Sequence, residues 1–147
     1  MAALAPARPR DILLVEDDAA DAMLIEEALL QLGAARTITL VQDGVEALEH
    51  LRDPDLAVPD VIVLDLNMPR MNGKELLAVL KEDPQLKVVP VVVLTTSSSP
   101  GDVSDAYRRH ANAYITKPVN LDEFIHAVQS IDAFFLDTVT ANPRDDA

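Results

Sequence analysis

Five short apolar runs occur along the chain, and segments with helical periodicity separate them. The runs at 11–16, 61–64 and 91–94 are apolar without alternation, which is typical of strands covered on both faces. The run at 37–41 indicates a weaker strand, and the fifth run covers 113–116. Parallel strands joined by helical crossovers produce this pattern, so the sequence predicts a doubly wound α/β fold.

Helices are predicted between and after these strands. In the first helix Leu24, Ala28 and Leu32 recur on one face, and Gly33 follows as a signal for the helix end. In the last one, a similar stripe of apolar residues continues to Phe135. The predicted helices cover 19–32, 44–51, 74–82, 102–110 and a segment from Asn120 or Leu121 to Phe135.

The length of 147 residues suits one domain with a single core. We expect a disordered leader at 1–10, the domain at 11–136 and a polar, frayed tail at 137–147. The leader lacks the apolar core of a signal peptide, and no apolar run approaches the ~20 residues of a membrane-spanning helix. The sequence contains no cysteine, which is compatible with the cytoplasmic location that we expect.

The chain carries 12 basic and 25 acidic residues, a formal net charge of −13. No long basic stretch is present to neutralise phosphates, so neither nucleic acid nor a membrane is an expected partner. An acidic surplus commonly serves solubility. Some of these acids, however, stand where predicted strands end, and that position calls for a chemical explanation.

Polar residues follow four of the predicted strands, at the edge where ligands bind to an open parallel sheet. Acids, a hydroxyl and a lysine that are remote in sequence are therefore predicted to meet there. Reading along the chain, the residues at these strand ends are Glu16, Asp17, Asp18, Asp65, Thr95 and Lys117.

Carboxylates that lie together repel one another unless a cation lies among them. Because the chain has no cysteine, and no histidine near the strand ends, the available ligands are hard oxygens, which suit Mg²⁺ or Mn²⁺. Mg²⁺ leaves positions for phosphate oxygens, so phosphoryl transfer is the predicted chemistry. Asp65 is the candidate nucleophile, with Lys117 paired to it at rest and Thr95 donating a hydrogen bond to the phosphoryl group.

Four motifs resemble those of the CheY-like receiver domain of response regulators, over residues 11–135. They are ILLVEDD at 12–18, VLDLNMPRMNG at 63–73, LTT at 94–96 and YITKP at 114–118. The resemblance implies a flavodoxin-like (βα)5 fold with strand order 2-1-3-4-5. It also implies a single-domain response regulator of a two-component system, phosphorylated on Asp65 by a sensor histidine kinase with Mg²⁺.

The resemblance further implies a role for each matching residue. Asp65 and Asp17 would bind the metal directly, Glu16 through water and Asn67 through its backbone carbonyl. Lys117 would neutralise phosphoryl charge, and its peptide bond to proline is commonly cis in the family. Such a protein is a phosphoacceptor rather than an enzyme, since it catalyses only its own phosphorylation and dephosphorylation.

Signalling would follow from a switch formed by Thr95 and Tyr114, which reshapes the surface of the fourth helix, fifth strand and fifth helix. The alternative is that Tyr114 is a half-buried strand aromatic without a switching role. Asp18 is predicted to cap the first helix rather than bind metal. The three histidines are expected at the surface.

Three stretches, at 95–100, 112–118 and 133–136, resemble the small response regulators that partner bacterial phytochromes. This likeness implies a bacteriophytochrome as the kinase. A homodimer through the fourth helix, fifth strand, fifth helix and the Phe134/Phe135 end is a further hypothesis; a helix end tucked onto the domain is the alternative.

Two rival functions stay open. Asp65-Leu66-Asn67 loosely resembles the nucleophile motif of aspartyl-phosphate phosphatases, although in those enzymes the nucleophile ends the first strand and a second acid follows. A degenerate receiver that acts only as an interaction module is the other rival. The intact set of Glu16, Asp17, Asp65, Thr95 and Lys117 weighs against it.

Overall fold

A computed structural model describes residues 9–138 of the chain. Its five strands form one parallel sheet in the order β2-β1-β3-β4-β5, which confirms the predicted doubly wound fold and strand order. The predicted leader and tail lie outside the described residues, apart from 9–10 and 137–138. The strands are β1 (Arg10–Val15), β2 (Arg36–Val41), β3 (Val61–Leu64), β4 (Val91–Thr95) and β5 (Ala113–Thr116).

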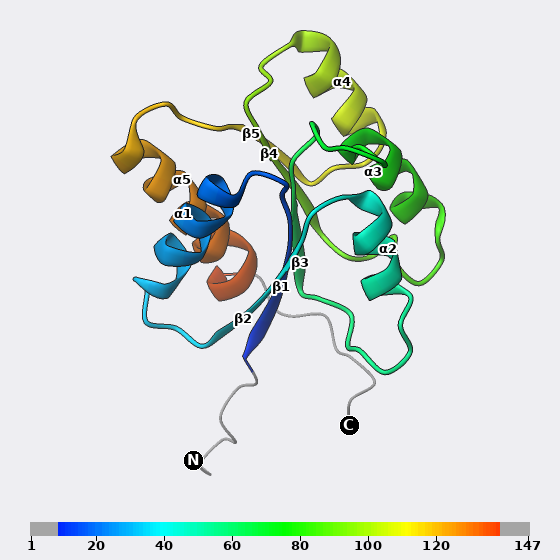
Figure 1. Ribbon diagram of the computed structural model, residues 1–147, viewed down its shortest axis with the longest axis horizontal. Helices are drawn as coiled ribbons and strands as arrows, with labels where there is room; N and C mark the ends of the chain where they lie inside the picture. Colours follow the sequence, from blue (N-terminus) through cyan, green and yellow to red (C-terminus); the bar gives the residue numbers. More distant parts are fainter. Residues whose placement is uncertain (1–8, 139–147) are drawn as a thin grey trace.

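Helices cover both faces of the sheet (Figure 1). On one face α1 (Ala19–Leu30) packs against α5 (Leu121–Asp132). On the other face lie α2 (Gly44–Leu51), α3 (Gly73–Glu82) and α4 (Pro100–Arg108). Within residues 9–138 no helix has the length and apolar character needed to cross a membrane.

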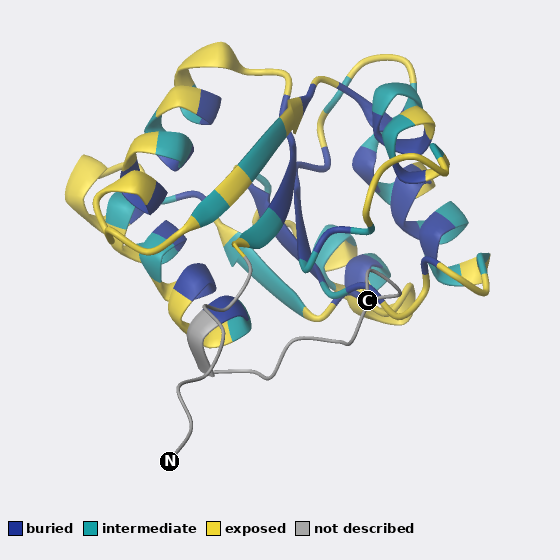
Figure 2. Ribbon diagram, turned by 90° about the horizontal axis from the view of Figure 1, so that it is seen from below, coloured by how far each residue is buried: buried dark blue, intermediate teal, exposed yellow. Residues whose placement is uncertain are grey.

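The central strands supply the core because both of their faces are covered. Every residue of β3 and β4 is buried, and Figure 2 shows this middle of the sheet in dark blue. Successive residues alternate between two apolar clusters: Ile62 and Leu64 face α2 and α3, while Val61 and Val63 face α1 and α5. The edge strand β2 is mostly half-buried or exposed, which explains its weaker apolar pattern.

The bounds of two helices, α1 and α4, differ from the prediction for local reasons. Helix α1 ends at Leu30, and Leu32 lies outside it in the turn that leads to Gly33, whose φ is +72°. Helix α4 begins at Pro100, since proline fits the first turn of a helix, where its missing amide is not needed. At its other end His110 is left-handed, with φ +68°, and terminates the helical segment.

The end of the last helix also differs from the prediction. Helix α5 stops at Asp132, and the chain continues as a wider π-helical turn, η1 (Ala133–Thr138). This turn changes which side chains face the core: Leu136 is buried, Phe135 is half-buried and Phe134 is 59% exposed. The two phenylalanine rings meet edge to face, with centroids 5.0 Å apart.

Candidate functional site

Four polar side chains that sequence analysis selected are buried together at the carboxyl edge of the sheet: Glu16, Asp65, Thr95 and Lys117. Backbone hydrogen bonds extend the strand pairing to these positions. The amide of Asp65 donates to the Val15 carbonyl at 3.1 Å, and the amide of Lys117 donates to the Thr95 carbonyl at 2.7 Å. The sheet itself therefore fixes where each side chain emerges.

The amino group of Lys117 is the centre of the cluster. Its Nζ lies 2.5 Å from Glu16 Oε1, 2.7 Å from Asp21 Oδ2 and 2.9 Å from Asp65 Oδ2. Burial lowers the pKa of Lys117, but the hydrogen bonds to the three carboxylates outweigh it and hold the pKa well above its usual range. The lysine is therefore charged at any physiological pH.

Sequence reasoning did not identify Asp21 as a member of this cluster. It lies in the first turn of α1, and its backbone amide donates to Asp18 Oδ1 at 3.0 Å, so the predicted cap at Asp18 is confirmed. An acid in a first helical turn is common because the helix dipole favours it. Only the approach of Lys117 from β5 distinguishes this one.

The carboxylate of Asp65 has both oxygens engaged. Oδ1 accepts the Asn67 backbone amide at 3.0 Å, and Oδ2 accepts Lys117. Burial acts to raise the pKa of Asp65, but hydrogen bonds from the Asn67 amide, Lys117 and Thr95 together lower it below its ordinary value. Asp65 is consequently ionised at neutral pH, as a carboxylate nucleophile must be.

The pKa of Glu16 shifts in the opposite direction from that of Asp65. Burial and the charge of Asp65 raise its pKa to about 7, although hydrogen bonds from Lys117 and from the Asp18 amide act against the rise. The pKa of Lys117 and the pKa of Glu16 both rise, because one lysine charge is shared by three carboxylates. The lysine gains from each of them, while the most deeply buried acid, Glu16, lacks a full counter-charge.

The donor set fits a hard divalent cation. Glu16, Asp17 and Asp65 each offer a carboxylate oxygen, and these oxygens lie within 4.8 Å of one another. Asp17 is exposed, and the Asn67 carbonyl accepts no hydrogen bond from any residue that the structure describes. Two buried acids, one accessible acid and a free carbonyl match the oxygen ligands that Mg²⁺ and Mn²⁺ prefer.

The loop that carries Asn67 is held from both sides. Gly73 packs so closely that a Cβ there would lie 2.7 Å from Leu66 Cα, and its amide donates to the Leu66 carbonyl at 3.0 Å. Arg70, with φ +59°, directs its guanidinium to the α2 cap Asp43, with nitrogen–oxygen distances of 2.7 and 3.1 Å. The sequence analysis did not predict this ion pair.

The two proposed switch residues lie on neighbouring strands. Thr95, the last residue of β4, is fully buried beside Asp65. Tyr114 in β5 is half-buried against the core, and its hydroxyl donates to the Ser97 carbonyl at 2.7 Å. The expectation of a cis bond before Pro118 is wrong: no described peptide bond is cis, and the bond between Lys117 and Pro118 has the trans form that X–Pro pairs intrinsically favour.

A parallel 2-1-3-4-5 sheet with an acid–lysine cluster at its carboxyl edge defines the receiver class of signalling domains. The family model of the response regulator receiver domain matches residues 12–129. The chain belongs to this family.

Individual receiver proteins match this chain in both sequence and structure. Response regulator Rcp1 from a Synechocystis species is 42% identical over 136 residues, covering 90% of this chain and 92% of that protein. The phosphorylated cyanobacterial phytochrome response regulator RcpA superposes with a TM-score of 0.88 at 42% identity, and Mn²⁺-bound Rcp1 with 0.87 at 41%. Each comparison covers 92% of this chain and 100% of the relative. The likeness to phytochrome response regulators is thereby confirmed.

The phosphatase alternative is not favoured. Asp65 follows β3, the central strand of the sheet, rather than the first strand, and the residue two positions later is Asn67. The chain matches receiver proteins over most of its length, whereas the likeness to the phosphatase motif is limited to Asp65-Leu66-Asn67.

Proposed function

We propose that this response regulator receiver accepts a phosphoryl group on Asp65 from the phosphohistidine of a sensor histidine kinase. The observation that carries the proposal is the setting of Asp65: a buried, ionised carboxylate beside Lys117, with Glu16 and Asp17 within reach of the same cation. In this role the chain is a phosphoacceptor that acts on its own carboxylate, not an enzyme that turns over other molecules.

The transfer needs no proton from Asp65. A carboxylate oxygen attacks phosphorus, the new P–O bond forms as the P–N bond breaks, and the electron pair returns to the imidazole of the donor. Lys117 remains beside the site to offset the added charge, and the Thr95 hydroxyl donates to a phosphoryl oxygen. Mg²⁺, held by Asp17, Asp65 and the Asn67 carbonyl directly and by Glu16 through water, would neutralise charge as the phosphoryl group approaches.

Output follows from the two residues next to the site. Thr95 moves with the phosphoryl group, and Tyr114 follows because both contact the segment after β4. The surface made by α4, β5 and α5 changes as a result. The hydrogen bond between Tyr114 and the Ser97 carbonyl supports a switching role over that of a bystander in the core.

The donor that we propose is a bacteriophytochrome kinase in the cytoplasm. The support for the kinase is the likeness to Rcp1 and RcpA, of which the latter is a phytochrome response regulator. The cysteine-free composition suits a reducing compartment.

We also propose a homodimer through α4, β5, α5 and the adjoining Phe134/Phe135 end. That side chain is 59% exposed on a turn anchored by the buried Leu136, so it presents an apolar ring on a fixed base. Size-exclusion chromatography with and without beryllofluoride tests this: a dimer in the wild type that Phe134→Ser abolishes is expected. A protein that stays monomeric in both conditions contradicts it.

The phosphoacceptor is tested by incubation with acetyl phosphate and Mg²⁺, followed by intact mass spectrometry. One base-labile phosphate is expected on the wild type and on Asp55→Asn, a matched change at an exposed loop aspartate. Asp65→Asn should carry none, and EDTA should prevent labelling. An adduct that survives in Asp65→Asn, or no adduct on the wild type, overturns the proposal.

A further inference from the structure

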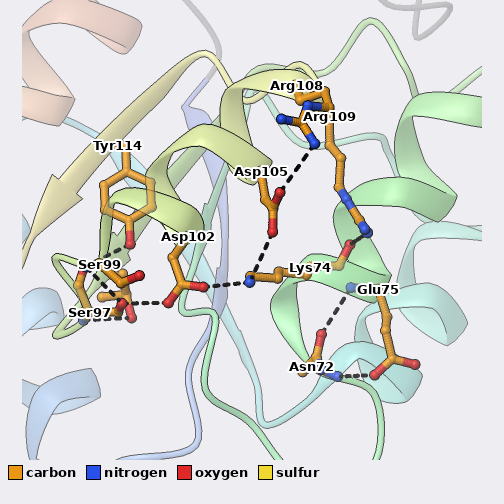
Figure 3. A network of polar contacts seen from close by, with 11 residues as sticks. Asn72, Lys74, Glu75, Ser97, Ser99, Asp102, Asp105, Arg108, Arg109 and Tyr114 are labelled. Carbon is orange, nitrogen blue, oxygen red and sulfur yellow. Dashed lines mark hydrogen bonds and ion pairs between the residues drawn. The ribbon is translucent and has the colours of Figure 1, made fainter.

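A second polar network joins α3 to the segment that follows β4 (Figure 3). Its central residue is Lys74, in the first turn of α3, whose amino group contacts Asp102 and lies 3.3 Å from Asp105 Oδ2. The other carboxylate oxygen of Asp102 accepts the Ser97 hydroxyl at 2.5 Å. A continuous chain of polar contacts thus runs from Lys74 through Asp102 to Ser97.

Ser97 is where this network meets the switch residues. Its carbonyl accepts the hydroxyl of Tyr114, and its amide lies 3.5 Å from Thr95 Oγ1. Thr95 in turn is buried beside Asp65. The position of Ser97 therefore sets the acceptor for Tyr114 and influences the only hydroxyl that faces Asp65 from β4.

Helix α4 depends on this network because it lacks a side-chain cap of its own. The helices α1, α2, α3 and α5 each have an N-cap side chain that accepts a backbone amide. In α4 the N-cap Ser99 makes no such bond, and the Ser99 amide instead donates to Ser97 Oγ at 3.4 Å. The start of α4 is thus held by Ser97 and Asp102, and Lys74 contacts Asp102.

Backbone contacts strengthen the link between the two helices. The guanidinium of Arg109, just after α4, donates to the Lys74 carbonyl at 3.0 Å. Lys74 therefore fastens both ends of α4 to α3, one through its side chain and the other through its carbonyl. The Lys74 side chain is 31% exposed, and isolated ion pairs of that kind add little to global stability. Its effect should appear in the position of α4 instead.

We propose that Lys74 is a positioning residue that holds the segment after β4 and the start of α4 in the arrangement in which Tyr114 reaches the Ser97 carbonyl. This inference rests on Asp65 as the phosphoacceptor. The phosphoryl group binds best to the protein in this arrangement. Its apparent affinity therefore rises with the fraction of molecules that already adopt the arrangement. Loss of Lys74 lowers that population and so weakens the response to phosphorylation.

The test uses the full chain with Tyr107→Phe in every protein, which leaves Tyr114 as the only tyrosine and a fluorescence reporter of its own surroundings. Beryllofluoride, a phosphoryl mimic, is titrated in saturating Mg²⁺ against Lys74→Met, Lys74→Arg and Lys87→Met. Lys87 is an exposed lysine outside the network and serves as the matched control.

We expect Lys74→Met to bind beryllofluoride roughly 3- to 10-fold more weakly, a typical size for coupling between neighbouring sites. Lys74→Arg should restore most of the affinity, and Lys87→Met should match the parent. Mn²⁺ affinity without beryllofluoride should be the same in all four proteins, because Lys74 contacts none of the metal ligands. Asp102→Asn, which breaks the same chain at its middle residue, should reproduce the loss. The double variant Lys74→Met/Asp102→Asn should bind little more weakly than Lys74→Met alone.

The outcomes separate the two proposals. If the parent protein binds no beryllofluoride, the proposed function of Asp65 fails. If the parent binds it and both Lys74→Met and Asp102→Asn bind it equally well, the positioning role of Lys74 is refuted. A loss of Mn²⁺ affinity in Lys74→Met would also refute it, since the defect would then lie in the metal site.

Discussion

Replacing Glu16 by glutamine tests the electrostatic account of the site. The change keeps the side chain's shape and an oxygen that can accept from Lys117, but it removes ionisation. Burial raises the pKa of Glu16 from 4.5 to about 7. Since a pKa difference of one between folded and unfolded states corresponds to about 1.4 kcal/mol, ionised Glu16 costs the folded state on the order of 3 kcal/mol.

The sign of this cost depends on pH. Between pH 4.5 and 7 the folded protein keeps a proton on Glu16 that the unfolded chain has lost, so wild-type stability falls as the pH rises through this window. The stability of Glu16→Gln does not fall in this window, because glutamine does not ionise. The raised pKa already includes the hydrogen bond from Lys117, so no further cost is subtracted for that bond. The variant should therefore be about 3 kcal/mol more stable than wild type at pH 8 and similar to it near pH 4.5.

Urea unfolding in EDTA, followed by circular dichroism at pH 5 and pH 8, measures the difference directly. Excess Mg²⁺ at pH 8 should narrow it, because a bound cation relieves the charge that the wild type carries. Glu27→Gln, at an exposed position of α1, controls for the loss of one surface charge. A Glu16→Gln protein that is no more stable than wild type at pH 8, or whose advantage is the same at both pH values, would refute the reasoning.

Two further predictions concern stability. Gly73→Ala should lose about 1–3 kcal/mol in urea unfolding, because its Cβ would lie 2.7 Å from Leu66 Cα, whereas Gly101→Ala, which meets only ordinary contacts, should lose far less; equal losses would contradict the packing argument. Asp132→Ala should lose about 3–5 kcal/mol by leaving the buried Arg36 guanidinium without the carboxylate that lies 2.6 Å away. Joint replacement of Arg36 and Asp132 by methionine and leucine should recover much of that loss, and a double variant as unstable as the single one would show that charge burial is not the cause.

The architecture and the buried centre of the site could be predicted because both follow from one-dimensional patterns. Strands buried on both faces, such as β3, produce uninterrupted apolar runs, and the carboxyl ends of parallel strands must meet at one edge. This reasoning placed Asp65 and Lys117 together although 52 positions separate them. It depends on period and strand direction, which the sequence displays directly.

The side-chain contacts of residues in helical turns could not be predicted from these patterns. Asp21 reaches Lys117, Arg70 reaches Asp43, and Lys74 reaches Asp102, each from or to a helical turn. Whether these pairs meet depends on the rotation of each helix against the sheet and on the reach of long side chains, which no local spacing encodes. The acids among them resemble ordinary residues of a first helical turn or cap.

The ion pair between Arg36 and Asp132 has a mechanical consequence. It fastens the last residue of α5 to the first residue of β2, while the other end of α5 begins four residues after Lys117. The 12 residues of α5 span about 18 Å, so a tilt of ~5° about the fastened end would move its free end by about 1.5 Å. If α5 tilts as a rigid body about this ion pair, the end near Lys117 moves most. Motion that starts beside Lys117 would swing the near end of the helix and leave the far end in place.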